Sequence, residues 1–241
     1  MAPRITAFVL AGGKGERLHP LTRDRAKPAV PFGGAYRIID FTLSNCLNSD
    51  IRRVNILVQY KCISLERHVR MGWNILSPSL DEYIVVIPAQ QRIGERWYQG
   101  TADAVFQNVY TIEQEKPDLI LVLSGDHVYK MNYRRMIDFH EERGGDLTLS
   151  AIEVSREQAK RLGVVRVDEQ GRVLEFVEKS DDPPEVPGKP GICMASMGIY
   201  VFNSAKLVER LAEDSQADSS HDFGKDIVPG MLSRDVVYAY P

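Results

Sequence analysis

The sequence predicts an α/β fold built on a mostly parallel sheet with helices on both faces. Over the first 150 residues, apolar runs of strand length alternate with segments whose apolar residues recur at helical spacing. A strand–helix–strand order of this kind places successive strands parallel to one another in a single sheet. Ligands of such sheets bind outside the carboxyl ends of the strands, so we expect functional residues there.

The predicted strands are short apolar runs that end at glycine, proline or a polar turn. Residues 5–10 form an apolar run that only Thr6 interrupts and that leads into Gly12 and Gly13, which is typical of a buried parallel strand. A turn containing Gly171 joins two of the later runs, which therefore read as a hairpin. The predicted strands are residues 5–10, 54–59, 83–87, 119–123, 146–154, 164–168, 172–178 and 197–202.

The predicted helices carry capping residues and stop signals. Thr101 can cap a long helix over residues 101–115, Asp103 suits the positive end of its dipole, and Pro117 follows its end. Ser155 can cap a short helix that extends to Leu162. The predicted helices are residues 39–49, 64–71, 101–115, 133–142, 155–162 and 205–213.

The composition is that of an ordinary soluble protein. The 241 residues are 44% hydrophobic and 26% charged, which excludes disordered, collagen-like and coiled-coil classes and fits one large domain or two small ones. Three cysteines without a CxxC spacing favour a reducing, cytoplasmic location. The apolar runs fall far short of the roughly 20 residues of a membrane span, so no membrane partner is expected.

The net charge of −3 argues against a general nucleic-acid binder but conceals an asymmetry. Residues 1–40 carry seven basic and three acidic groups, whereas the remaining 201 residues carry 23 basic and 30 acidic groups. A positive segment on an acidic body suggests a local anion site. Ordinary scatter of surface charge explains the counts equally well.

The loop after the first strand is rich in glycine and positive charge. Three glycines in four positions let backbone N–H groups approach an anion closely. Glu16 excludes a Walker A loop, and Leu18 excludes the G-x-G-x-x-G dinucleotide fingerprint. The alternative is a tight turn without a ligand, but the neighbouring cations favour a phosphate site. The residues concerned are Gly12, Gly13, Lys14, Gly15, Arg17, Arg25 and Lys27.

Asp126 is the candidate metal ligand. It follows Gly125 at the carboxyl tip of the strand over residues 119–123, where it can hold Mg²⁺ against phosphate oxygens. An aspartate after a strand is often only a turn or helix cap. The glycine-rich loop on another strand of the same sheet favours the metal. His127 has no partner readable from the sequence, and the five histidines lack metal-ligand spacing.

Two further segments leave their alternatives open. Trp97 and Tyr98 stand before Gly100 at a loop-to-helix junction, where aromatic rings can line a sugar or base pocket and helix-end N–H groups can act as donors. Plain packing over the helix start is the other interpretation. Lys179, after the last hairpin strand, can bind a phosphate or form a surface ion pair with equal ease.

These motifs occur together in a known family. Residues 12–18 with residues 27–29 resemble the signature of the sugar-1-phosphate nucleotidylyltransferases. Longer motifs along nearly the whole chain are more closely similar to the glucose-1-phosphate adenylyltransferases. They are residues 32–41 (FGGAYRIIDF), 43–46 (LSNC), 88–91 (PAQQ), 97–104 (WYQGTADA), 124–130 (SGDHVYK), 176–179 (FVEK), 195–200 (ASMGIY) and 219–226 (SSHDFGKD).

The resemblance implies a fold and a reaction. The fold is a Rossmann-like sheet of the nucleotide-diphospho-sugar transferase type, forming one catalytic domain over residues 1–241. The reaction is Mg²⁺-dependent transfer of AMP from ATP to glucose 1-phosphate, which gives ADP-glucose and pyrophosphate for glycogen (α-glucan) synthesis. Such catalysis needs positioning and charge stabilisation rather than a protein nucleophile, in keeping with a sequence that shows no Ser-His or Cys-His arrangement.

The resemblance also implies roles for individual residues. Arg17, Lys27 and Asp126 are catalytic, with Asp126 holding the metal. The remaining assignments are nucleotide binding by Gly12, Gly13, Gly15, Gln90, Gly100 and Thr101, glucose 1-phosphate binding by Tyr98, Gly163, Glu178, Lys179 and Ser196, a less defined role near the sugar for Asp222 and Phe223, and a regulatory anion at Arg25 and Arg37.

The implied partners are the two substrates, a phosphorylated metabolite effector and further copies of the chain in a homotetramer. Asp24 stands where some members carry a basic residue and would repel a phosphorylated activator, so the effector type stays open. Members continue into a second metal-binding aspartate and a C-terminal parallel β-helix, so we expect a truncated catalytic domain that binds metal weakly. The alternatives are an impaired regulatory or binding module, and transfer of another nucleotide to another sugar phosphate.

Overall fold

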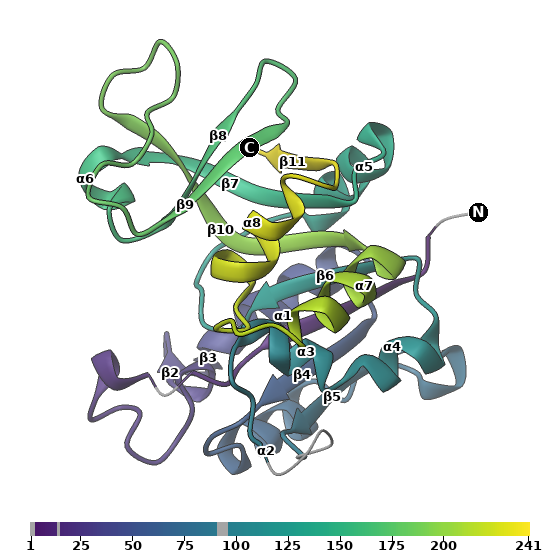
Figure 1. The fold of residues 1–241 in the computed structure, drawn as a ribbon. Coiled ribbons are helices and arrows are strands. Elements are labelled where there is room, and N and C mark those ends of the chain that lie inside the picture. The colour runs from purple at the N-terminus through teal and green to yellow at the C-terminus, as the bar shows by residue number, and fades with distance from the viewer. Residues whose placement is uncertain (1–2, 14, 91–95) are drawn as a thin grey trace.

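A large sheet runs through the middle of the molecule in the computed structural model, which describes residues 3–13, 15–90 and 96–241 (Figure 1). Within these residues nine strands join in one sheet, in the order β11-β7-β10-β6-β1-β4-β5, with β8 beside β10 and β9 beside β8. The strands are β1 (Ile5–Leu10), β4 (Arg53–Val58), β5 (Tyr83–Pro88), β6 (Leu119–Ser124), β7 (Leu147–Ser155), β8 (Gly163–Val167), β9 (Val173–Glu178), β10 (Ile192–Asn203) and β11 (Val237–Tyr240).

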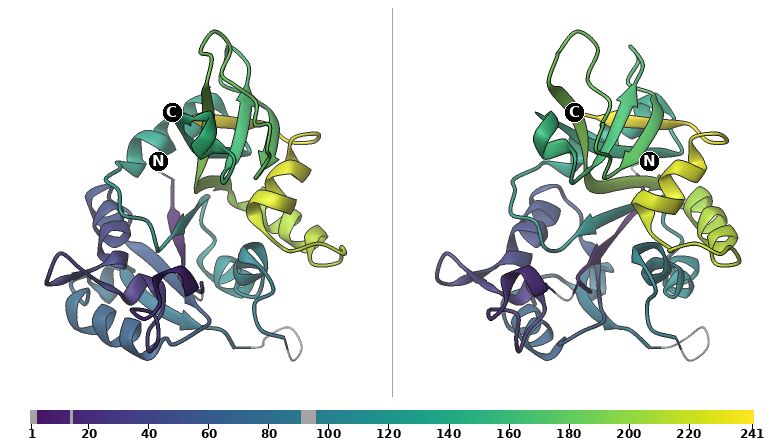
Figure 2. Two further views of the ribbon diagram at one scale, coloured as in Figure 1. Left: turned by 90° about the vertical axis from the view of Figure 1, so that its left-hand side faces the viewer. Right: turned by 60° about the vertical axis from the view of Figure 1, so that its left-hand side comes forward.

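The sheet is mostly parallel, as the sequence predicts. β1 pairs in parallel with β4 and with β6, β4 pairs in parallel with β5, and β11 pairs in parallel with β7. β10 runs antiparallel to both of its neighbours in the main order, β6 and β7. The hairpin β8–β9, drawn in green, extends from β10 at one end of the molecule, and the blue strands β4 and β5 lie at the other end (Figure 2).

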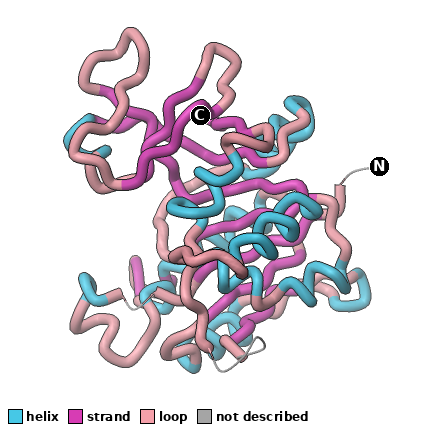
Figure 3. The backbone as a smooth tube through the Cα atoms, in the orientation of Figure 1, coloured by secondary structure: helices cyan, strands magenta, loops and turns pink. Residues whose placement is uncertain are grey.

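Helices cover both faces of the sheet (Figure 3). The two faces are distinct in β1, where Phe8 belongs to one apolar cluster while Ala7 and Val9 belong to the other. The Phe8 face packs against α3, α4 and α7, and the opposite face against α1, α2 and α5. The helices are α1 (Ile38–Asn48), α2 (Ile63–Gly72), α3 (Thr101–Phe106), α4 (Val109–Glu115), α5 (Tyr133–Arg143), α6 (Arg156–Ala159), α7 (Ser204–Asp214) and α8 (Val228–Met231).

The long helix predicted over residues 101–115 is divided in two. The side-chain amide of Asn108 donates to the carbonyl of Ala104 at 2.8 Å, and the backbone N–H of Asn108 bonds to Val105 instead. Because the amide takes the carbonyl that the backbone N–H would use in a continuous helix, α3 and α4 separate at Gln107 and Asn108.

Two other predicted elements have different lengths. α6 is capped by Ser155 as predicted but ends at Ala159, because residues 160–162 form turns rather than helix. β10 begins at Ile192 rather than residue 197, since its first half pairs with β7 and with the hairpin strand β8. A register shift between Ser196 and Tyr200 interrupts β10, and Gly198 adopts a left-handed φ of 67° there.

Several short elements were not predicted. β2 (Pro31–Phe32) and β3 (Tyr36–Arg37) form a small separate sheet before α1. A π-helical turn over Phe223–Ile227 leads into α8, and the chain then forms β11 at the edge of the sheet beside β7. Across the described residues, no helix has both the length and the apolar character needed to cross a membrane.

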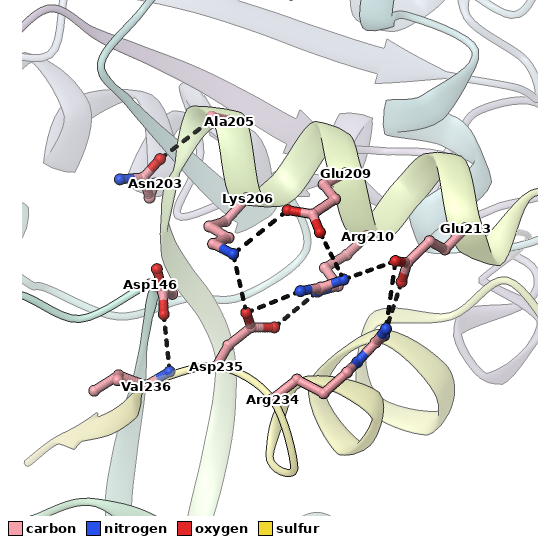
Figure 4. A network of polar contacts seen from close by, with 10 residues as sticks. All are labelled: Asp146, Asn203, Ala205, Lys206, Glu209, Arg210, Glu213, Arg234, Asp235 and Val236. Atoms are coloured by element: carbon pink, nitrogen blue, oxygen red, sulfur yellow. Dashed lines mark hydrogen bonds and ion pairs between the residues drawn. The ribbon is translucent and has the colours of Figure 1, made fainter.

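A buried ion pair connects α7 with the segment before β11 (Figure 4). Arg210 donates from Nε to Asp235 at 2.7 Å and from Nη2 to the other oxygen at 3.0 Å, and the Asp235 side chain is only 1% exposed. Glu213 accepts from both Arg210 and Arg234, at 2.8 and 2.7 Å. Two-point contact with neutralised charge makes this a rigid attachment of residue 235 to α7.

Replacing Asp235 with Ala should therefore lower the free energy of unfolding by about 3–5 kcal/mol, because the variant removes the buried carboxylate that accepts from both Nε and Nη2 of Arg210. Urea denaturation measures this loss. Combining it with Arg210→Met should recover much of the stability, since no unpaired charge remains. A single variant within about 1 kcal/mol of wild type would contradict this account.

His140 is a buried titratable group on α5, outside the lining of the cavity described below. Its Nδ1 lies 2.8 Å from the Thr148 hydroxyl, and burial lowers its pKa from 6.5 to about 4. Between these two pKa values the unfolded chain binds the proton and the folded chain does not. The folded state is therefore stabilised by a neutral His140 above pH 6.5 and loses this stability as the pH falls toward 4.

We expect the free energy of unfolding to fall by about 2–3 kcal/mol more in wild type than in His140→Gln between pH 7 and pH 4.5. The reason is that glutamine does not take up the proton that the unfolded histidine binds. Urea titrations of both proteins at several pH values give the two slopes. Parallel pH profiles would show that His140 does not titrate as described.

Candidate functional site

A cavity of about 570 Å³ opens at the carboxyl ends of β1 and β6. β1 and β6 are adjacent, but the chain runs from β1 to β4 on one side and from β6 to β7 on the other. The connections therefore leave the carboxyl ends of this pair in opposite directions, which is where open α/β sheets bind ligands. The lining residues include Gly12, Gly13, Lys27, Tyr98, Gly100, Thr101, Ser124, Asp126, Gly163, Glu178, Ser196, Tyr200, Asp222 and Phe223.

Lys27 and Asp126, which follows β6, form an ion pair that lines this cavity. Lys27 Nζ lies 2.7 Å from Asp126 Oδ2, and the Ser124 hydroxyl donates to Oδ1 at 2.5 Å. Burial opposes ionisation of Asp126, but the hydrogen bonds from Lys27 and Ser124 outweigh it and hold the pKa of this carboxyl below its usual value. Asp126 is therefore a carboxylate at neutral pH, ready to accept a metal ion or a cationic group.

The glycine-rich loop lies beside this pair. A Cβ built on Gly13 would meet no atom of the described residues within 4 Å, and Gly13 does not have a positive φ, so these residues do not require glycine there. Gly15 is different: its φ of 65° is left-handed, and a Cβ would lie 2.9 Å from the Thr22 methyl group. Gly12 and Gly13 line the cavity, whereas Lys14 lies outside the described residues.

Lys61 fixes the far part of this loop. Its ammonium group donates to the carbonyls of Thr22 at 2.9 Å and Arg23 at 2.6 Å. The Thr22 hydroxyl in turn donates to the carbonyl of Gly15 at 2.9 Å. Nothing in the sequence distinguished Lys61 from a surface lysine, because its partners lie nearly 40 residues away in the chain.

On the other side of the cavity from the Lys27–Asp126 pair, the start of α3 contacts residues 222–224. Thr101 donates from Oγ1 to Asp222 at 2.9 Å and accepts from the backbone N–H of Phe223 at 3.0 Å. A Cβ on Gly100 would lie 2.1 Å from the carbonyl oxygen of His221, so only glycine allows this approach. Gly100 and Thr101 are thus brought to the cavity together with Asp222.

The expected cap of α3 is wrong. Thr101 does not cap the helix, because its hydroxyl is used by Asp222 and Phe223 and the capping position is Gly100. Two of the first three N–H groups of α3 are also used within the protein. The N–H groups of Ala102 and Asp103 both point to the carbonyl of His221, at 2.8 and 3.4 Å.

Most residues assigned to the sugar phosphate meet in one part of the cavity. Tyr98, Gly163, Glu178 and Ser196 all line it. A Cβ on Gly163 would lie 2.6 Å from the Phe176 ring and 2.8 Å from Glu178, so glycine keeps this part open. Lys179 is not among the lining residues: its side chain is 60% exposed and lies 3.1 Å from Glu178, which is the ion-pair alternative.

Tyr200 was missed by sequence reasoning. It lines the cavity from β10, its ring stacks on Phe223 at 5.7 Å between centroids, and burial raises its pKa. A tyrosine within an apolar strand reads as an ordinary core residue, and its position after the register shift in β10 could not be foreseen.

Six assigned residues that the structure describes lie outside the cavity lining: Gly15 and Lys179, described above, and Arg17, Arg25, Arg37 and Gln90. Arg17 is exposed on a short 3₁₀ turn, and Gln90 follows β5 beside residues 91–95, which the structure does not describe. Arg37 donates to the Ser64 hydroxyl at 2.6 Å. Burial and the nearby charge of Arg25 lower the pKa of Arg37, so the two guanidinium groups are close enough to repel each other.

Replacing Gly100 with Ala should displace the His221 carbonyl and so weaken binding of any cavity ligand by roughly tenfold or more. The added methyl group meets backbone atoms that cannot move without separating α3 from residues 221–222. Gly72→Ala is the matched control, because a Cβ there meets nothing within 4 Å. Calorimetric titration with the ligand of the wild-type protein makes the measurement, and equal affinities in both variants would refute the prediction.

Comparison with known proteins places the chain in a defined group. The model of the nucleotidyl transferase family matches residues 6–241. Proteins named glucose-1-phosphate adenylyltransferase in Rhodopirellula baltica and Methylococcus capsulatus are 56% and 53% identical to it, over 100% and 97% of the chain. A protein named glucose-1-phosphate adenylyltransferase 2 in Vibrio cholerae is 50% identical over 97% of the chain.

The chain spans only part of these relatives. It covers 54% of the Rhodopirellula protein, 55% of the Methylococcus protein and 58% of the Vibrio protein. The match therefore concerns about half the length of the curated relatives.

Proposed function

The chain belongs to the nucleotidyl transferase family, and from this premise we propose that it transfers AMP from ATP to glucose 1-phosphate. The products are ADP-glucose, the donor for glycogen (α-glucan) synthesis, and pyrophosphate. The names and identities of the relatives support this choice of nucleotide and sugar. We also infer that residues 1–241 form one catalytic domain.

The single observation that carries the proposal is the Lys27–Asp126 pair beside Gly12 and Gly13. The triphosphate of ATP needs cations and approachable backbone N–H groups, and the loop after β1 offers both at the switch point of the sheet. Gly13 supports this assignment because its freedom from side-chain contacts leaves room for a phosphate group. Lys27 can exchange its bond to Asp126 for one to a phosphate oxygen, with Arg17 adding charge.

The residues present are suited to one divalent cation shared with the substrate. Within the described residues no three His, Cys, Asp or Glu side chains come together, so Asp126 supplies the single carboxylate. Mg²⁺ commonly takes one or two carboxylates and completes its shell with water and substrate phosphates. When bound, it would neutralise developing charge on the phosphates. We propose that Asp126 holds it, and that a second carboxylate from a longer chain would tighten the site.

We assign the sugar phosphate to the part of the cavity that Glu178, Ser196 and Phe223 line. Glu178 and Ser196 offer acceptors for sugar hydroxyl groups, and Tyr98 and Phe223 offer apolar ring surfaces. In the proposed reaction an oxygen of the sugar phosphate attacks the α-phosphorus of ATP in line, the bond to the β-phosphate oxygen breaks, and pyrophosphate leaves. The two walls contribute by holding both substrates in this alignment.

Regulation, assembly and location follow as further parts of the proposal. We propose that Arg25 and Arg37 bind a phosphorylated effector, supported by the mutual repulsion of their guanidinium groups, which an anion would relieve. Assembly as a homotetramer in the cytoplasm is inferred from the resemblance stated above.

The test is release of pyrophosphate by the 241-residue chain, which should require ATP, glucose 1-phosphate and Mg²⁺ together. Asp126→Asn should reduce the rate by about 100-fold or more while leaving the unfolding transition in place. Asp138→Asn is the matched control, because Asp138 is exposed on α5 and outside the cavity lining.

The other outcomes are equally informative. Calorimetric binding of both substrates without turnover would favour the binding-module alternative. Faster turnover with another nucleoside triphosphate or sugar phosphate would redirect the substrate assignment. Absence of both binding and turnover would overturn the proposal.

A further inference from the structure

We propose that His221 is a positioning residue. Together with Asp214 it aligns the nucleotide wall of the cavity, formed by Gly100 and Thr101, with the sugar wall, formed by Asp222 and Phe223. This inference rests on the proposed function for its kinetic consequences, but its structural basis is independent of it. Neither His221 nor Asp214 is among the residues that line the cavity. Both must therefore act through the residues that they hold.

The side chain of His221 is held in a compact polar cluster. Its Nδ1 lies 2.8 Å from Asp214 Oδ2 and 3.0 Å from the Ser219 hydroxyl. Ser219 also donates to the other Asp214 oxygen at 2.8 Å. The histidine and aspartate side chains are only 14% and 10% exposed, so water competes little for these bonds. The cluster joins the end of α7 to the start of residues 221–224.

The backbone of His221 is held in an uncommon conformation. Its φ is 52°, in the left-handed region that a non-glycine residue occupies at a cost. The backbone N–H of His221 donates to the Ser219 hydroxyl at 3.1 Å. Contacts of the backbone and of the side chain with the same cluster therefore keep His221 in this conformation.

This conformation directs the His221 carbonyl at the start of α3. The carbonyl accepts the N–H of Ala102 at 2.8 Å, in the place that Gly100 leaves open by lacking a Cβ. The next residue, Asp222, accepts the hydroxyl of Thr101 at 2.9 Å. Two successive residues of one wall are thus bonded to two successive residues of the other.

The two walls have different proposed ligands. Gly100 and Thr101 are assigned to the nucleotide, whereas Asp222 and Phe223 lie beside the sugar phosphate residues. In-line attack needs both substrates within a narrow range of distance and angle, and small displacements reduce the rate strongly. His221 is placed to set the relative position of the two substrates without touching either.

The variants that test this role separate the side chain from the backbone. His221→Gly removes the side chain and tolerates the left-handed φ, and Asp214→Asn replaces one acceptor of the cluster. His221→Asn keeps an N–H donor near the position of Nδ1, and asparagine also tolerates this φ. We expect the first two variants to lower kcat and to raise the KM for glucose 1-phosphate and for ATP, so that kcat/KM falls by about 10- to 100-fold. The Asn variant should stay within about threefold of wild type.

Amide hydrogen exchange gives a second readout that needs no substrate. The N–H groups of Ala102 and Phe223 bond across the two walls, so they should exchange at least about tenfold faster in His221→Gly than in wild type. His140→Gln is the control for a buried histidine outside the cavity lining. It should change the free energy of unfolding while leaving both KM values and these two amides unaltered.

The outcomes separate the two proposals. If wild type neither binds nor converts the substrates, the proposed function fails, and the exchange experiment still decides the role of His221. If wild type is active but His221→Gly and Asp214→Asn lower only the free energy of unfolding, with KM values and exchange unchanged, His221 is merely structural and this inference is overturned.

Discussion

β1 lies in the interior of the sheet with a parallel neighbour on each side, and the position of the cavity depends on this pairing. Leu10 pairs with Leu57 of β4 and with Ser124 of β6, so the three strands end at the same level. The loops that follow β1 and β6 must therefore meet there. Because helices cover both faces, a polar ligand can reach the backbone only at this edge.

The Lys27–Asp126 pair shows how the fold keeps charge at this edge without a ligand. Each group is about two-thirds buried, and each would be costly there alone. Paired, they neutralise one another, and Ser124 satisfies the remaining oxygen of Asp126. The charged groups of this site are therefore in place before a substrate arrives. When a substrate binds, Lys27 and Asp126 exchange each other for the substrate as partner, and they do not first have to be removed from water.

The parts that could be read from the sequence are those determined by local pattern. The runs that became β1 and β6 are almost entirely apolar, so their ends, and with them Gly12 and Asp126, could be located. The parts that could not be read depend on individual side-chain contacts and on the register of strands. Asn108 divides a helix through its own side chain, Tyr200 reaches the cavity through a register shift, and Lys61 bonds to a loop nearly 40 residues earlier.

The glycines show the same difference between what local sequence indicates and what distant contacts determine. Gly100 stands before a helix, where the sequence offers it as part of a ligand site, yet its structural requirement comes from the carbonyl of His221, more than 100 residues later. Gly13 has no such requirement within the described residues. Gly100 therefore allows close packing of the backbone, whereas Gly13 leaves open space. Only the surroundings of the two glycines distinguish these roles.

The attachment of Asp235 to Arg210 closes a loop of 25 residues that contains Asp222 and Phe223. Local opening of this loop would require a buried ion pair to separate or α7 to leave the sheet. One wall of the cavity is consequently part of the cooperative unit that unfolds only with the whole domain. The loop after β1 is held by hydrogen bonds from Lys61 and Thr22 to backbone carbonyls, so we expect the fluctuations that admit and release ligands on that side.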